Sequence, residues 1–293
     1  MGYGSYRASD WTKLKQSRGI NNASGAEQIF KDNRIQDKYN PKFIEMRESC
    51  DSADSPLSTP IIIGFDVTGS MGYLAAEIAK NSLNKTITYI YDKQPVTNPH
   101  VMCAPFTSPV ADTGLQVTQF EADIRVVEQL LELKVGMGGN RYSYDSLVWY
   151  FAAKHTRTDC FEKRGKKGFI FCVGDEVCGG DEGERLSAYE IKSVFGDSVG
   201  SYFDLEELRY MASQKYEIFH IVTGYQVQKA YQTWNKFLPG RNAALSSKNI
   251  DCLSEVITSI MQMANGTPRE DVINQWQGST KDIVRAAIAG ISL

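Results

Sequence analysis

A buried strand, a short polar loop and a helix follow one another without a break in residues 61–83, and this stretch constrains the fold most. The strand is an apolar run that ends at Asp66, and apolar residues recur at helical spacing from Met71 onward. Between the two patterns lie Thr68 and Ser70. Open α/β sheets bind ligands at the carboxyl ends of their strands, so a carboxylate and two hydroxyls occupy a ligand-binding position. Such hard oxygens suit Mg²⁺ or Ca²⁺ better than zinc.

Further strands alternate with helical patterns along the rest of the chain. Apolar runs predict strands at His100–Phe106, Phe169–Val173 and Tyr216–Thr223, and an alternating pattern predicts another at Leu115–Phe120. Helical spacing separates most of these runs. This order predicts an α/β fold with a mostly parallel central sheet and helices on both faces.

The first loop resembles the metal-ion-dependent adhesion site of von Willebrand factor A (VWA) domains, whose motif is Asp-x-Ser-x-Ser. Here the motif reads Asp66-Val67-Thr68-Gly69-Ser70, with a Thr in place of the first Ser and the hydroxyl retained. The family takes its last donor from an Asp after the next core strand, and Asp175 stands at that position. The resemblance implies a Rossmann-like VWA domain with extensions at both ends.

The second loop of the family, commonly Gly-Gly-Thr before a helix, is where this chain departs most. Gly138-Gly139-Asn140 precedes a helical run here, so the Thr is missing. Asn140 occupies its slot and offers a carbonyl oxygen, and Ser143 is the alternative ligand. The resemblance therefore implies Mg²⁺ as the expected ion, with Mn²⁺ or Ca²⁺ as further candidates. The implied metal ligands are Asp66, Thr68, Ser70, Asn140 and Asp175.

The resemblance also divides the chain into three parts. The VWA-like domain is expected at residues 58–265. Residues 1–57 are polar and turn-rich, and they are predicted to form an N-terminal extension packed on the domain surface, with a partner-binding arm as the alternative. Residues 266–293 are predicted to form a C-terminal helical extension. Its last helix, at about 281–290, has an apolar stripe that needs a surface to bury against.

The composition indicates which classes of partner and which cellular location to expect. The chain has 293 residues and a net charge of −3, which gives no reason to expect nucleic-acid binding. Its six cysteines show no Cys-x-x-Cys spacing, which indicates reduced thiols in an intracellular protein, so we expect a cytoplasmic location. The chain starts without a signal-peptide core and contains no apolar run of membrane-spanning length, so no membrane association is expected.

Other interpretations of these residues stay open. Asp66, Thr68 and Ser70 are also good helix-capping residues. An Asp after a strand is the nucleophile of haloacid-dehalogenase-like phosphatases, but those enzymes need a second Asp where Thr68 stands. No P-loop is present and no dinucleotide-binding glycine pattern follows a strand, so we expect no enzymatic activity. The three histidines lack metal spacing and are expected to be structural, and the acidic loop 176–184 is expected to be a solvated turn.

The leading functional hypothesis is a metal-dependent protein–protein interaction module. An Asp or Glu of a partner protein would complete the coordination of Mg²⁺. The family resemblance implies a scaffold or adaptor in an intracellular complex, for example beside an AAA+ ATPase. The alternatives are a Mg²⁺-dependent hydrolase that uses Asp66, or a structural subunit with a vestigial metal site.

Overall fold

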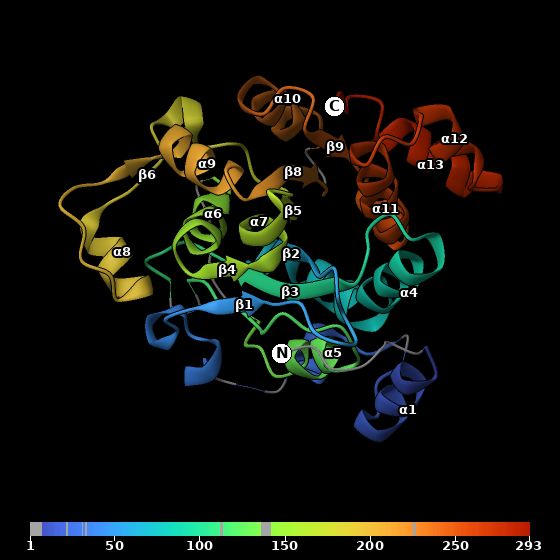
Figure 1. Ribbon diagram of the computed structural model, residues 1–293, viewed down its shortest axis with the longest axis horizontal. Helices are drawn as coiled ribbons and strands as arrows, with labels where there is room; N and C mark the ends of the chain where they lie inside the picture. The colour runs from blue at the N-terminus through green and yellow to red at the C-terminus, as the bar shows by residue number, and fades with distance from the viewer. Residues whose placement is uncertain are drawn as a thin grey trace.

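The fold is built on a five-stranded parallel sheet with the strand order β3-β2-β5-β8-β9 (Figure 1). The computed structural model describes residues 8–21, 23–30, 32, 34–111, 114–135, 142–224 and 227–293. The strands are β2 (Thr59–Asp66), β3 (Pro99–Phe106), β5 (Gly168–Gly174), β8 (Tyr216–Val222) and β9 (Asn242–Ala244). Every neighbouring pair in this sheet is parallel, which confirms the predicted parallel arrangement.

Each face of the sheet is covered by helices. Successive side chains of a strand point to opposite faces, so Ile61 and Ile63 of β2 enter one apolar core and Ile62 enters the other. In Figure 1, α4 and α11 lie to the right of the sheet and α6 and α9 to its left. The α/β fold class is thereby confirmed. The first core includes residues of α3 (Gly72–Glu77), α4 (Leu83–Lys93) and α11 (Leu253–Ala264), and the second includes residues of α6 (Asp145–Lys154), α8 (Ala188–Phe195), α9 (Leu205–Ser213) and α10 (Val227–Phe237).

Shorter elements complete the fold. The remaining strands are β1 (Arg47–Ser49), β4 (Thr156–Thr158), β6 (Arg185–Leu186) and β7 (Phe203–Asp204). The remaining α-helices are α1 (Ala8–Arg18), α2 (Ala26–Ile29), α5 (Arg125–Leu130), α7 (Asp159–Arg164), α12 (Arg269–Asn274) and α13 (Gly278–Ala287). Short stretches of 3₁₀-helix lie at η1 (Asp37–Tyr39), η2 (Pro41–Phe43), η3 (Gly69–Met71), η5 (Gly180–Glu182) and η6 (Ser247–Cys252), and η4 (Ile78–Ser82) is a short π-helix.

The segment predicted as a strand at Leu115–Phe120 runs antiparallel along β3 without forming a continuous ladder. It is joined to β3 by isolated bridges, including Phe106 with Leu115. The Thr118 amide donates to the Cys103 carbonyl at 3.0 Å, but the Cys103 amide donates to the Thr118 side-chain Oγ1 at 2.9 Å. A side chain therefore replaces one backbone acceptor, which interrupts the regular pairing that defines a strand.

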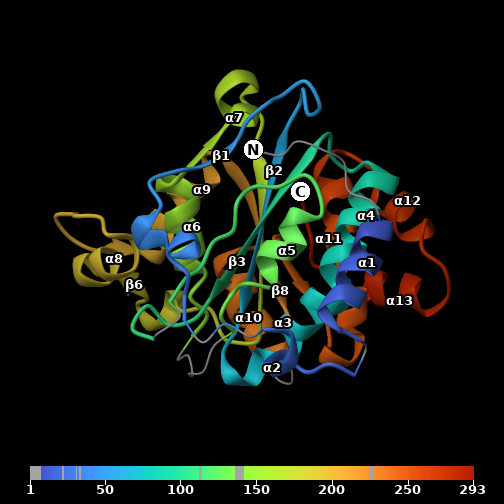
Figure 2. The ribbon, with the colours of Figure 1, turned by 90° about the horizontal axis from the view of Figure 1, so that it is seen from below.

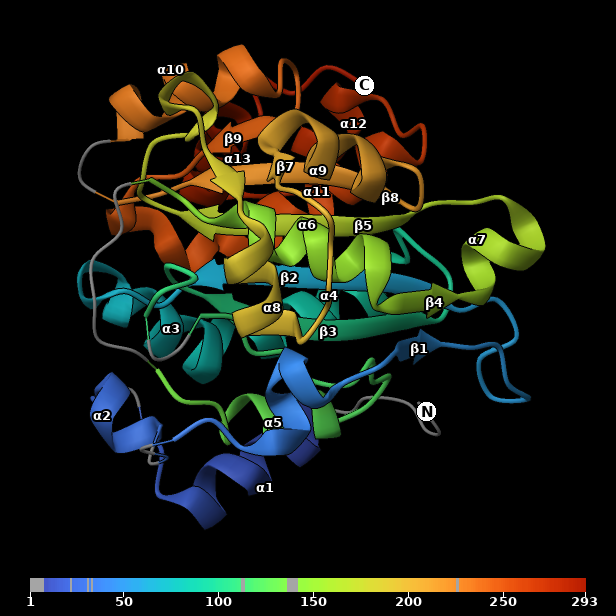
Figure 3. The same cartoon turned by 90° about the vertical axis from the view of Figure 1, so that its left-hand side faces the viewer.

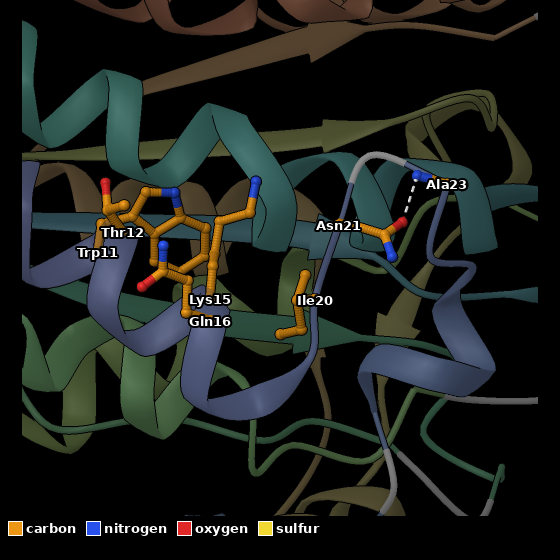
Figure 4. Close-up of a pocket in the computed structure, with 7 residues that line it drawn as sticks. All are labelled: Trp11, Thr12, Lys15, Gln16, Ile20, Asn21 and Ala23. Carbon is orange, nitrogen blue, oxygen red and sulfur yellow. Dashed lines mark hydrogen bonds between the residues drawn. The ribbon is translucent and has the colours of Figure 1, made fainter.

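The N-terminal segment packs on the domain. Strand β1 pairs in parallel with β4, and the two lie side by side at the edge of the molecule in Figure 3. Helix α1 packs beside α4, as Figure 2 shows, and buries Trp11. Next to it lies an open hollow of about 620 Å³ lined by Trp11, Thr12, Lys15, Gln16, Ile20, Asn21 and Ala23 (Figure 4). None of these lining residues belongs to the loops that carry Asp66 or Asp175.

The C-terminal helices α12 and α13 pack against α11. Val284 of α13 and Ile288, which follows the helix, are buried in the same core as α11. Trp276, between the two helices, donates from Nε1 to the Ser259 hydroxyl at 2.9 Å. The last helix therefore buries its apolar stripe on the chain itself, whereas the boundaries predicted at residues 57 and 265 stay predictions.

Candidate metal centre

The site lies where the strand order of the sheet reverses. From β2, the chain passes through α3 and α4 to β3 on one side, whereas β5 pairs with the other side of β2. A crevice forms at the carboxyl ends of two strands whose connections leave in opposite directions. Asp66 is the last residue of β2 and Gly174 the last residue of β5, with Asp175 following at once. The topology therefore places the first loop, which follows Asp66, and the loop that begins at Asp175, the third loop, at the same edge.

Asp66 is a fully buried carboxylate at this edge. The Thr68 backbone amide donates to its Oδ1 at 2.7 Å, and the Thr68 hydroxyl also forms a hydrogen bond with it. Burial raises the pKa of Asp66 from 3.8 to about 7, against the lowering effect of the Thr68 bonds. The negative charges of Asp175 and Glu176 contribute to the rise. A cation beside this group would favour its ionised form.

The third loop brings two more carboxylates near Asp66. Burial and the charge of Asp175 raise the pKa of Glu176, whereas Lys229 lowers it. Gly224 follows β8 and has a φ of +108°, and a Cβ built on it would lie 2.6 Å from the Asp175 Cβ. Only glycine allows both this conformation and this approach. The position of Asp175 therefore depends on a glycine in another loop.

The second loop is described in part. Asn140 lies outside the described residues, and Ser70 is described in its backbone alone, within η3. Ser143 is fully buried, and its hydroxyl donates to Asp145 Oδ1 at 2.6 Å. A Cβ built on Gly174 would lie 3.5 Å from both the Ser143 Oγ and the Asp66 Cβ. Ser143 and Asp66 therefore flank the end of β5. The assignments of metal ligands stay predictions.

Asp145, which the sequence pattern did not single out, and His220, which was expected to be structural, join this cluster. Asp145 begins α6, and its Oδ2 accepts a hydrogen bond from His220 Nδ1 of β8 at 2.7 Å. Both side chains are fully buried. The His220 ring stacks on Trp234 at 3.8 Å between centroids. Ser143, Asp145 and His220 thus form a chain with the carboxylate in the middle, which differs from a catalytic triad because the histidine does not contact the serine.

The acidic loop after Asp175 is partly buried, and its interpretation as a solvated turn is wrong for Glu184. This side chain is 2% exposed, and it accepts a hydrogen bond from the Ser146 hydroxyl at 2.5 Å. Burial raises the pKa of Glu184 to about 8. Asp181 of the same loop does face solvent, where it pairs with Lys236 at 2.7 Å. The density of charge in the sequence does not distinguish the buried Glu184 from the exposed Asp181, because the difference arises from α6, which covers Glu184 alone.

The donor set suits a hard divalent cation. Carboxylate and hydroxyl oxygens converge at the edge, and these are the ligands that Mg²⁺ takes in proteins. Thr223, next to Gly224, has a fully buried hydroxyl with no hydrogen-bond partner among the described residues. The Thr223 amide donates to the Gly174 carbonyl at 2.8 Å, so this orphaned donor lies at the same edge. Within the described ranges, no three His, Cys, Asp or Glu side chains form a metal cluster, so hydroxyls would have to contribute.

The other two histidines lie away from this edge. His155 contacts the Glu45 carbonyl through Nδ1 at 3.1 Å and Asp197 through Nε2 at 2.9 Å. His100 Nδ1 lies 3.1 Å from the Ser49 hydroxyl. These three contacts tie the N-terminal segment or a neighbouring loop to the domain, as the structural interpretation of the two histidines predicted.

Comparisons with known proteins give structural likeness alone. No family model matches the sequence. No curated protein matches it either. Among solved structures, the chain is similar to the pilus adhesin SpaC from Lactobacillus rhamnosus GG in its open conformation, with a TM-score of 0.45 and 8% identity over 75% of this chain and 31% of that chain. It is also similar to BatB, a conserved hypothetical protein from Bacteroides thetaiotaomicron, with a TM-score of 0.39 and 14% identity over 71% of this chain and 100% of that chain.

The chain thus spans less than a third of the adhesin's length. Across the part of the chain that the structure describes, no helix is both long and apolar enough to cross a membrane. The case for a metal centre rests on this chain's own residues at the end of β2 and β5.

Proposed function

We propose that this chain is a divalent-cation-dependent protein-binding module on a VWA-like domain. The observation that carries the proposal is the buried Asp66 carboxylate at the reversal of strand order, held by Thr68 and lying beside Asp175. Thr68 and Ser70 would hold the ion directly, and Asp66 and Asp175 directly or through water. Asn140 or Ser143 would occupy the remaining side.

The chemistry of binding follows from these ligands. A bound Mg²⁺ would take six oxygens and leave one position for a carboxylate from another protein. The hydrogen bonds from Thr68 hold the Asp66 carboxylate in one orientation before any ion arrives. The partner we propose is a protein that presents Asp or Glu, in a complex of the kind that VWA proteins form with AAA+ ATPases. An intracellular location is part of the same proposal.

Metal binding is the first test. Calorimetric titration of the full chain with MgCl₂ and with MnCl₂ should give saturable binding to a single site. Asp66→Ala should abolish it and leave the fold intact, because the variant removes a ligand at the strand end. Equal metal affinity for the wild type and the variant would reject the proposal.

A second test separates this proposal from a hydrolase that uses Asp66 as a nucleophile. p-Nitrophenyl phosphate is incubated with the chain and Mg²⁺, with Asp66→Ala as the control. The binding-module proposal expects equal background turnover for the two proteins. Turnover that depends on both Asp66 and Mg²⁺ would favour the hydrolase.

A further inference from the structure

We infer that Ser143 supplies the second-loop hydroxyl ligand in place of the missing Thr, and that Asp145 and His220 hold it in position. This inference rests on the proposed function, since it names the residues that complete the same site. Ser143 lies close to Asp66 at the end of β5. The Ser143 Oγ and the Asp66 Cβ both lie 3.5 Å from where a Gly174 Cβ would stand, so their separation is at most twice that distance.

The hydrogen bond of Ser143 leaves its lone pairs available to an ion. A hydroxyl has one proton to donate and two lone pairs to offer. Ser143 donates its proton to Asp145 Oδ1 at 2.6 Å, a short charge-assisted bond. The hydroxyl oxygen therefore keeps its acceptor side for other groups near the end of β5. Metal ligands in proteins are commonly oriented by hydrogen bonds to groups outside the coordination sphere, and Asp145 would do this for Ser143.

Asp145 is held in turn by His220. His220 Nδ1 lies 2.7 Å from Asp145 Oδ2, and its proton fixes the carboxylate's orientation. The imidazole cannot rotate freely, because its face stacks on Trp234 at an interplanar angle of 13°. Trp234 Nε1 donates to the Glu176 carbonyl at 3.1 Å. This contact leads back to the third loop, so one buried network connects the second and third loops of the site.

Ser146 provides a matched control. It is as fully buried as Ser143 and lies three residues farther along, in α6. Its hydroxyl donates to Glu184 rather than to Asp145. Removing either hydroxyl deletes one buried hydrogen bond, which has a similar cost to folding. Only the loss of Ser143 should change the binding of an ion.

The experiment measures the affinity for Mn²⁺ and the number of water molecules on the bound ion. Mn²⁺ titrations followed by electron paramagnetic resonance give the affinity, and water-proton relaxation gives the hydration. Ser143→Ala should weaken binding at least as much as the loss of an outer-shell partner does, which is about 10- to 100-fold, and should add one water to the bound ion. Ser146→Ala should change neither quantity. Wild-type affinity and hydration in Ser143→Ala would overturn the assignment of this ligand.

The positioning role is tested separately. His220→Phe keeps a ring against Trp234 and removes the donor to Asp145. It should weaken Mn²⁺ binding by about tenfold while the hydration of the bound ion stays at the wild-type value, since Ser143 is still present. If this variant does not fold, Asp145→Asn tests the same link and should show the same weaker binding. Wild-type affinity in the folded variant would overturn the role of the His220–Asp145 pair.

The two proposals fail in different ways. If neither the wild type nor any variant binds Mn²⁺, the proposed function fails and this inference fails with it. If Asp66→Ala abolishes binding and Ser143→Ala leaves it unchanged, the metal site stands and only the assignment of its second-loop ligand is wrong.

Discussion

Replacing Asp66 by Asn should stabilise the metal-free protein at neutral and alkaline pH. The side chain is fully buried at the end of β2, and its pKa rises from 3.8 to about 7 on folding, mainly because burial disfavours the charged form. Asn has nearly the same shape, carries no charge and can still accept the Thr68 amide through its oxygen. The substitution therefore removes the cost of a buried charge and little else.

The size of this stabilisation and its pH dependence follow from the pKa of Asp66 in the unfolded and in the folded state. Below pH 3.8 the carboxyl is protonated in both the folded and the unfolded state, so its contribution to stability is fully present. As the pH rises towards 7, the unfolded chain releases its proton first and the free energy of unfolding falls. Above pH 7 the loss levels off at about 4 kcal/mol. Asp66→Asn has no carboxyl group at this position, so its free energy of unfolding does not fall for this reason.

Urea unfolding in EDTA at pH 5 and pH 8 is the appropriate assay. The free energy of unfolding of the variant should exceed that of the wild type by about 2 kcal/mol at pH 5 and by about 4 kcal/mol at pH 8. Taking the difference between two proteins at each pH cancels the titration of groups that do not interact with Asp66. Asp181→Asn is the matched control, because its carboxylate is 57% exposed and paired with Lys236 at the surface. Its substitution should leave stability nearly unchanged.

Magnesium should narrow the difference in stability between the two proteins at pH 8. Saturating MgCl₂ stabilises only the protein that binds it, by about 2.7 kcal/mol at a hundredfold excess over the dissociation constant. The wild type should therefore gain stability at pH 8 and Asp66→Asn should not. The reasoning is refuted if the metal-free variant is no more stable than the wild type at pH 8, or if the difference is the same at both pH values.

Three further predictions concern other parts of the structure. Gly224→Ala should lower stability by about 1–3 kcal/mol in urea unfolding, because alanine at this φ would also press against Asp175; an unchanged midpoint would contradict it. Trp276→Ala should lower the free energy of unfolding by about 3–5 kcal/mol and remove the hydrogen bond to the Ser259 hydroxyl, while Mn²⁺ affinity stays at the wild-type value. A loss of Mn²⁺ affinity in this variant would show that the C-terminal helices support the site. Asn140→Ala should leave Mn²⁺ affinity at the wild-type value, because Ser143 is inferred to supply the second-loop ligand; weaker binding in Asn140→Ala that is restored in Asn140→Thr would return this position to Asn140.

Much of the architecture was predictable from local patterns. The apolar run that ends at Asp66 and the run that ends at Gly174 are short and continuous, and strands buried on both faces require such runs. A parallel sheet places all such ends along one edge, so the convergence of Asp66 and Asp175 followed from the order of elements. The antiparallel segment beside β3 was recognised as extended, but the side-chain acceptor Thr118 that interrupts its pairing was not.

The tertiary structure alone decided which side chains surround these two carboxylates. Asp145 and His220 are 75 residues apart, and their contact depends on where the tertiary fold places the start of α6 relative to β8, which no local pattern describes. Glu184 and Asp181 occupy the same acidic loop, yet one is buried against Ser146 and the other is solvated. Sequence patterns report the conformation of nearby residues, because that is set by local sterics and hydrogen bonds. Burial, pKa and contacts between distant residues arise only when the elements pack together, and these are the properties that would tune the site for an ion.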